Sequence, residues 1–217
     1  MLPPFVYIPP CLHLPKPPCH CKMNKTPLKQ SKAELESAQS SIDSMMNAKS
    51  FEEFERHWRN FLGCLEKVWV KTERACQDQR SQFQPWQGAF SRLRKKDMLL
   101  RYLKQARDAD THSIQEITEI YPGHTSFRSA NKGSHYIKKM VISNGGISHY
   151  EGDPMIQETV MPHPIAIKVQ NNGEWYNPPS THLGKHIENH HPVTLALLGF
   201  NFYKDFLEQV EEKFFSE

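Results

Sequence analysis

A long helix-periodic apolar stripe that begins just after Ser50 constrains the fold of this chain more than any other feature. Its apolar residues recur at intervals of three and four: Phe51, Phe54, Trp58, Phe61, Leu62, Leu65, Val68 and Trp69. Ser50 and Glu53 form a Ser-x-x-Glu capping box, which marks the start of a helix. The pattern predicts an amphipathic helix over residues 51–79 that has to bury one face.

Three further segments have helical periodicity. Residues 28–48 carry a modest apolar stripe with no breaker, and residues 86–120 carry another that Tyr121-Pro-Gly should close. Residues 192–215 begin with a proline, which suits the first turn of a helix. Because this last helix needs a partner for its apolar face, we expect the four helices to pack as a bundle.

The segment between the third and fourth predicted helices has the residue pattern of short strands joined by turns. Residues 135–143 look like a strand that ends in the turn Asn144-Gly-Gly. Residues 155–161 and 164–170 alternate in part, and Asn171-Asn-Gly-Glu is a hairpin turn. We therefore expect a small antiparallel β insertion here.

This order predicts an α+β fold that is mainly α, with the β insertion between the third and fourth helices of a bundle. The expected organisation is a helical bundle at residues 23–134, a β-rich insertion at 135–191 and a C-terminal helix at 192–217 that completes the bundle.

Seven of residues 1–22 are proline, so neither a helix nor a central strand can run through them. We expect a disordered extension, which is either a real tail or an over-extended reading frame whose true start is Met23. A soft metal could bind the cysteines and histidines of this segment, but the usual Cys-x2-Cys pair is missing: Cys11, His13, Cys19, His20 and Cys21.

The five cysteines are an odd number and cannot all pair within the chain. Cys64 and Cys76 would lie about 18 Å apart on one helix, beyond disulfide reach. No apolar run approaches the length of a membrane span. We expect a reduced, cytoplasmic protein with no membrane partner.

Charge is unevenly distributed along the chain. Residues 1–134 carry 21 Lys and Arg against 14 Asp and Glu, whereas residues 135–217 carry 6 against 10. Residues 80–107 alone hold eight basic residues against Asp97. Such a stripe attracts a phosphate backbone, although a solvated helix face is the alternative. The candidate RNA contacts are Arg92, Arg94, Lys95, Lys96, Arg101 and Lys104.

The chemistry candidate is Arg107-Asp108-x-x-x-His112, beside this stripe. At 100° per residue, Asp108 and His112 lie on one helix face, where Asp108 could hydrogen-bond the imidazole and fix its tautomer. Arg107 and His112 point about 140° apart on a regular helix. They converge only if the helix is distorted or if a second subunit supplies the partner group.

The motif resembles the Arg-(Asn/Asp/His)-x-x-x-His signature of HEPN domains, in a helical layout that covers residues 23–121 and 192–217. The resemblance implies a HEPN-like helical bundle. Many HEPN proteins are metal-independent RNases and often serve as the toxin of a defence or toxin–antitoxin system. It also implies a homodimer with the site at its interface, RNA as substrate, no cofactor, and room for an antitoxin protein as a partner.

The expected reaction is endoribonuclease cleavage by attack of the ribose 2′-OH on the adjacent phosphate. His112 would transfer protons and Arg107 would stabilise the developing phosphorane charge. The alternative is a non-catalytic helical module that binds nucleic acid or protein. In that case Arg107 would form a buried ion pair with Asp110, and Asp108 a surface pair with His112.

Three histidines near the end of the β insertion form a second candidate cluster. His182, His186 and His190 would form one stripe on a helix and could then bind zinc or nickel. Gly184 and the flanking prolines argue against a stable helix there. We expect polar loop residues and no metal.

Overall fold

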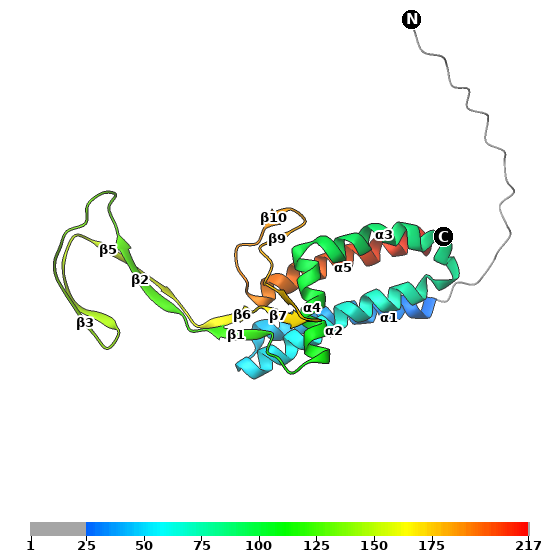
Figure 1. Cartoon of the computed structure of the whole chain (residues 1–217), viewed down its shortest axis with the longest axis horizontal. Coiled ribbons are helices and arrows are strands. Elements are labelled where there is room, and N and C mark those ends of the chain that lie inside the picture. Colours follow the sequence, from blue (N-terminus) through cyan, green and yellow to red (C-terminus); the bar gives the residue numbers. More distant parts are fainter. Residues whose placement is uncertain (1–24, 217) are drawn as a thin grey trace, which may run out of the picture.

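The computed structural model of the protein describes residues 25–216. The expectations for residues 1–22 and for a start at Met23 lie outside the described residues. The described chain is an α+β structure. In sequence, short antiparallel strands lie between four N-terminal helices and one C-terminal helix (Figure 1). The helices are α1 (Lys25–Asn47), α2 (Phe51–Ala75), the 3-10 turn η1 (Gln77–Gln79), α3 (Arg80–Lys96), α4 (Met98–His112) and α5 (Pro192–Phe214).

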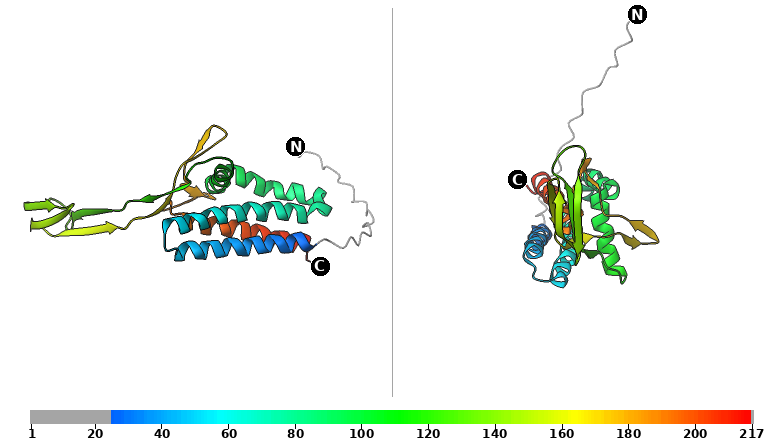
Figure 2. Two further views of the ribbon diagram at one scale, coloured as in Figure 1. Left: turned by 90° about the horizontal axis from the view of Figure 1, so that it is seen from below. Right: turned by 90° about the vertical axis from the view of Figure 1, so that its left-hand side faces the viewer.

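Three of the four predicted helices are confirmed as α1, α2 and α5. The Ser50 hydroxyl accepts a hydrogen bond from the backbone N–H of Glu53 at 3.2 Å, so the predicted cap forms. Pro192 occupies the first turn of α5 as expected. In Figure 2, α1, α2, α3 and α5 run alongside one another, whereas α4 turns across one end of α3.

The prediction of one helix over residues 86–120 is wrong in three respects. The helix begins earlier, at Arg80, with Pro85 inside it. The helix breaks at Asp97, whose backbone is extended (φ −65°, ψ 134°) and whose side chain caps α4 by accepting from the backbone N–H of Leu100 at 3.0 Å. It also ends at His112, and residues 118–121 form a strand instead of a last helical turn. The apolar spacing of Ile114 and Ile117 fits a helix, but only Ile117 is buried.

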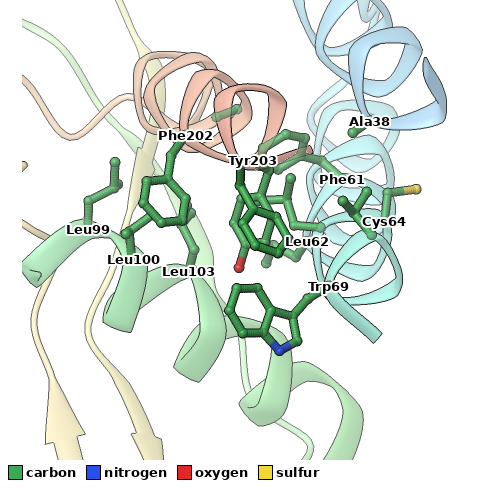
Figure 3. Close-up of a cluster of buried hydrophobic side chains, with 14 of the residues drawn as sticks. Ala38, Phe61, Leu62, Cys64, Trp69, Leu99, Leu100, Leu103, Phe202 and Tyr203 are labelled. Carbon is green, nitrogen blue, oxygen red and sulfur yellow. The ribbon is translucent and has the colours of Figure 1, made fainter. Parts of the chain in front are cut away.

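The core lies between α2, α4 and α5, with α1 along its side. Figure 3 shows Phe202 and Tyr203 of α5 facing Leu103 of α4 and Trp69 of α2. Gly199 lets α5 approach α4 closely, because a Cβ there would lie 2.4 Å from Leu103 Cδ1. Buried residues of α5 belong to the same core cluster as those of α2 and α4.

The strands pair two by two, always antiparallel: β1 with β6, β2 with β5, β3 with β4, β7 with β8 and β9 with β10. Their bounds are β1 (Thr118–Tyr121), β2 (His124–Ser129), β3 (Ile137–Ser143), β4 (Gly146–Gly152), β5 (Met155–Val160), β6 (His163–Ala166), β7 (Val169–Asn171), β8 (Glu174–Tyr176), β9 (Thr181–His182) and β10 (Lys185–His186).

The first three pairs follow one another outward and build a long arm that projects from the helices (Figures 1 and 2). We call residues 118–166 the β arm. The predicted turns at Asn144-Gly145 and Asn172-Gly173 are confirmed, with positive φ at all four residues. The strand region begins at residue 118 and not at 135, so residues 118–134, expected in the bundle, belong to the arm.

Candidate functional site

The Arg107–His112 motif lies on the last turns of α4. Ala106 and Ala109 are buried against the body of the protein, which leaves Arg107 and Asp108 part-exposed on either side of them. Arg107 Nη1 donates to Asp108 Oδ1 at 3.1 Å, and Lys104 Nζ donates to the other carboxylate oxygen. Burial alone would raise the pKa of Asp108, but Lys104 and Arg107 hold that pKa below its ordinary value.

His112 is the last residue of α4 and is exposed. Within residues 25–216 its imidazole makes no hydrogen bond, ion pair or ring contact. The expected bond between Asp108 and His112 is not formed; the two oxygens of Asp108 accept instead from Lys104, one turn earlier, and from the adjacent Arg107. Since α4 is a regular helix to His112, Arg107 and His112 stay about 140° apart within one copy.

The alternative pair of Arg107 with Asp110 is also not formed. Asp110 instead bonds Arg59 of α2, which also donates to Glu55 at 3.0 Å and to Glu116 at 3.1 Å. The pKa of Glu116 is raised chiefly by its hydrogen bond with Glu55. Sequence reasoning missed this acidic cluster, because its members come from α2, α4 and the segment after α4.

Arg94 was expected to bind RNA, but it is a buried structural residue. It donates to Glu66 Oε2 at 2.6 Å and to the Tyr203 hydroxyl at 2.9 Å. Its guanidinium also lies 4.1 Å from the ring centroid of Trp69. Arg94 therefore stabilises the core through these contacts and is not available to bind RNA at the surface.

The other members of the basic stripe differ in how open they are. Arg92, Lys95 and Lys96 are exposed near the end of α3. Arg101 is exposed, with its guanidinium 5.9 Å from the Tyr176 ring, whereas Lys104 is engaged by Asp108. Four of the six predicted RNA contacts thus keep a charge on the surface.

A buried histidine–carboxylate pair, which sequence reasoning missed, joins the β region to the break between α3 and α4. His182 Nδ1 lies 2.9 Å from Asp97 Oδ1, and the backbone N–H of Leu183 donates to Asp97 Oδ2 at 2.7 Å. Burial alone would raise the pKa of Asp97, but the hydrogen bond from His182 keeps it below its ordinary value. The signal in the sequence was Asp97 itself, the lone acid in the basic run.

The three histidines considered for a metal site are not brought together. His182 is buried on β9, whereas His186 on β10 and His190 are exposed. In the described part of the chain, no three His, Cys, Asp or Glu side chains gather as metal ligands.

Comparison with protein-family models, with curated proteins and with solved structures finds no match to this chain. None of the helices in residues 25–216 combines the length and the apolar character that crossing a membrane requires.

Proposed function

We propose that the protein is a homodimeric, metal-independent endoribonuclease of HEPN-like type, acting as a toxin or defence effector. The observation that carries the proposal is the state of the motif on α4. His112 is exposed and uses none of its ring atoms to bond another described residue, and the Arg107 side chain is 32% exposed. A proton-transfer group and a planar cation are both within reach of a substrate.

The chemistry assigned to each residue follows from its contacts. His112 exchanges protons with the 2′-OH or with the leaving 5′ oxygen, since a neutral imidazole accepts a proton and an imidazolium donates one. Arg107 stabilises the charge that develops on the phosphorane through its fork of N–H donors. Asp108 acts on Arg107, which it holds at 3.1 Å, and not on His112 as the sequence had indicated.

The separation of Arg107 and His112 on one helix requires a second copy to complete the site. Ile114, two residues after His112, is fully exposed. A solvent-exposed isoleucine beside the motif supports a subunit contact at this end of α4, because burying its side chain in an interface would remove apolar surface from water. The proposal therefore pairs Arg107 of one subunit with His112 of the other.

Cleavage of RNA in the presence of EDTA, with 2′,3′-cyclic phosphate products, is the direct test. His112→Ala should lower the rate by about 10²–10⁴-fold, while His186→Ala, an exposed histidine outside the motif, should leave it unchanged. Arg107→Ala should be as damaging, and Arg107→Lys should not restore the rate, since lysine lacks the bidentate fork. Asp108→Ala should give a milder loss.

A non-catalytic binding module is the second candidate, and the β arm favours it. The arm exposes large apolar side chains on β3 and β5, among them Ile142 at 67% and Ile156 at 36%. Exposed apolar surface of this kind is typical of interaction sites. Purified protein that cleaves no RNA under any of these conditions would leave this candidate in place of the enzyme.

A further inference from the structure

An open cavity of about 570 Å³ lies at the base of the β arm. The turn between α1 and α2 forms one side, the N-terminus of α5 another, and the β1–β6 pair of the arm the third. Its volume is in the range of pockets that hold small organic ligands, about 300–1,000 Å³. None of the motif residues on α4 lines it.

Two imidazoles line this cavity, and the backbone fixes the tautomer of each. His163 Nδ1 lies 2.8 Å from the carbonyl oxygen of Met161, so this nitrogen carries the proton and Nε2 is left as an acceptor. His191 Nδ1 accepts from the backbone N–H of Val193 at 3.2 Å, so in the neutral ring Nε2 carries the proton. With both rings neutral, the two neighbouring imidazoles that line the cavity carry one acceptor and one donor.

The two rings keep this arrangement through their neighbours. Their centroids are 6.2 Å apart and their planes differ by 26°. Phe54 meets His191 edge-on at 5.8 Å, and Tyr121 lies 5.3 Å from His163. Burial, and to a lesser extent the nearby His163, lowers the pKa of His191.

The rest of the lining is mostly apolar, with the hydroxyl groups of Ser50 and Thr194 and one cation. Phe51, Phe54 and Ile120 supply flat or bulky apolar surface, and Lys49 is the one lysine or arginine among the described lining residues. No aspartate or glutamate of the described residues lines the cavity, although the Glu53 carboxylate accepts from the backbone N–H of Lys49 at 2.8 Å just outside it. This combination suits a planar ring with polar edges that is joined to a phosphate.

We propose that this cavity binds a nucleotide, either free or as one unit of an RNA strand. The base packs against the aromatic wall, donates to His163 Nε2 and accepts from His191 Nε2, while the phosphate lies toward Lys49. Because the walls come from both the helices and the base of the arm, the bound nucleotide joins these two parts of the molecule. The inference goes beyond the proposed cleavage, because it uses none of the motif residues.

Calorimetric titration of the full chain tests the proposal. The probes are AMP, GMP, CMP and UMP, with ribose 5-phosphate and inorganic phosphate as ligands that lack a base. A 2′-O-methyl oligoribonucleotide gives the strand arm, because it has no 2′-OH to attack and stays intact whether or not the protein is an RNase. Tighter binding of the oligonucleotide than of every mononucleotide, with the difference lost in His163→Ala, assigns the site to RNA, and the reverse order of affinities assigns it to a free nucleotide.

Variants locate the binding. His163→Ala should weaken binding of the preferred probe by about two- to tenfold, the effect of losing one neutral hydrogen bond. His191→Ala should do the same, although it also removes the cap of α5, so the His163 variant is the primary one. His149→Ala, on the exposed face of the arm, should leave binding unchanged.

Three results would overturn the proposal: no binding of any nucleotide probe at millimolar concentration, binding of phosphate as tight as that of nucleotides, or full binding by the His163→Ala protein. Binding that persists in a protein without RNase activity would reject the proposed enzyme and keep this site. Cleavage by the His163→Ala protein at the parent rate, with nucleotide binding lost, would keep both.

Discussion

The helical body and the β arm both contain many large apolar side chains, but only the body buries them. In the body each helix buries one face, and Trp58 and Phe206 have no exposed surface at all. In the arm every residue of β3 is exposed, although the strand contains Ile137, Val141 and Ile142. The body is held by a core, whereas the arm is held by its ladder and a few polar cross-strand contacts.

One such contact shows how the arm keeps its shape. His135 Nε2 and the Tyr150 hydroxyl are 2.8 Å apart, and the same hydroxyl donates to the carbonyl of Asp153 at 2.6 Å. These bonds join the segment just before β3 to β4 and to the residue that follows β4. An isolated two-stranded ribbon is only marginally stable in water. The stability of the arm therefore depends on its attachment to the helical body.

The largest expected difference between the two regions is the cost of removing a large apolar side chain. Phe206 lies between Trp69 and Phe90, with ring centroids 4.8 Å and 5.1 Å away. Phe206→Ala should lower the free energy of unfolding by about 3–5 kcal/mol. Ile142→Ala in the arm should change it by less than about 0.5 kcal/mol. Urea unfolding followed by helical circular dichroism measures both, and similar costs would contradict the comparison.

Loss of the buried arginine should come next in size. Arg94→Ala leaves Glu66 without its cation and the Tyr203 hydroxyl without its donor, and should cost about 3 kcal/mol. Arg92→Ala, two residues away on the exposed face, is the matched control and should leave unfolding unchanged. A stable Arg94→Ala protein with weakened RNA binding would restore Arg94 as a nucleic-acid contact.

The Asp97–His182 pair should contribute a smaller and pH-dependent amount. Asp97→Ala removes a helix cap and the contacts to β9, at a cost of about 2 kcal/mol at neutral pH. Because the pKa of Asp97 is lower in the folded than in the unfolded chain, this stabilisation is present above the unfolded value of about 3.9 and is lost as the pH falls below it.

Melting curves of the parent and the Asp97→Ala protein should therefore converge as the pH is lowered below about 4. Asp205→Ala on the exposed face of α5 serves as the control and should follow the parent throughout. A gap between parent and Asp97→Ala that stays constant with pH would show that the carboxylate charge plays no part.

The smallest expected effect is that of removing the outer arm. Ser129 and Met155 are directly paired, so residues 130–154 can be replaced by an Asn-Gly turn that joins β2 to β5. The melting temperature of the body should stay within about 2 °C, because no core residue is lost. A drop of ten degrees would show that the outer arm stabilises the helices after all.

The same contrast explains what the sequence could predict. Periodicity located α1, α2 and α5 because each buries one face along its whole length. The turns at Asn144 and Asn172 were also predictable, since an Asn-Gly pair favours positive φ wherever it stands. In the arm neither face of β2 or β3 is buried, so these strands show no clear alternation of apolar and polar residues. The start of the strand region at residue 118 was therefore missed.

The errors in the candidate site have a tertiary origin. At the break, the Asp97 side chain caps α4 and also bonds His182 and Leu183, which lie far along the chain. Arg94 is withdrawn from the surface by Glu66 and Tyr203. The spacing of the motif placed Asp108 and His112 on one face correctly, but it could not show that Lys104 and Arg107 would occupy the carboxylate.

Mixing two inactive variants tests most directly whether Arg107 and His112 form one site across two subunits. Arg107→Ala and His112→Ala proteins should each be inactive alone. When they are unfolded together and refolded at equal concentration, half of the dimers are mixed and each carries one intact pair, so about a quarter of the parent RNase activity should return. A mixture as inactive as its components, in a dimer shown to exchange subunits, would contradict the shared site.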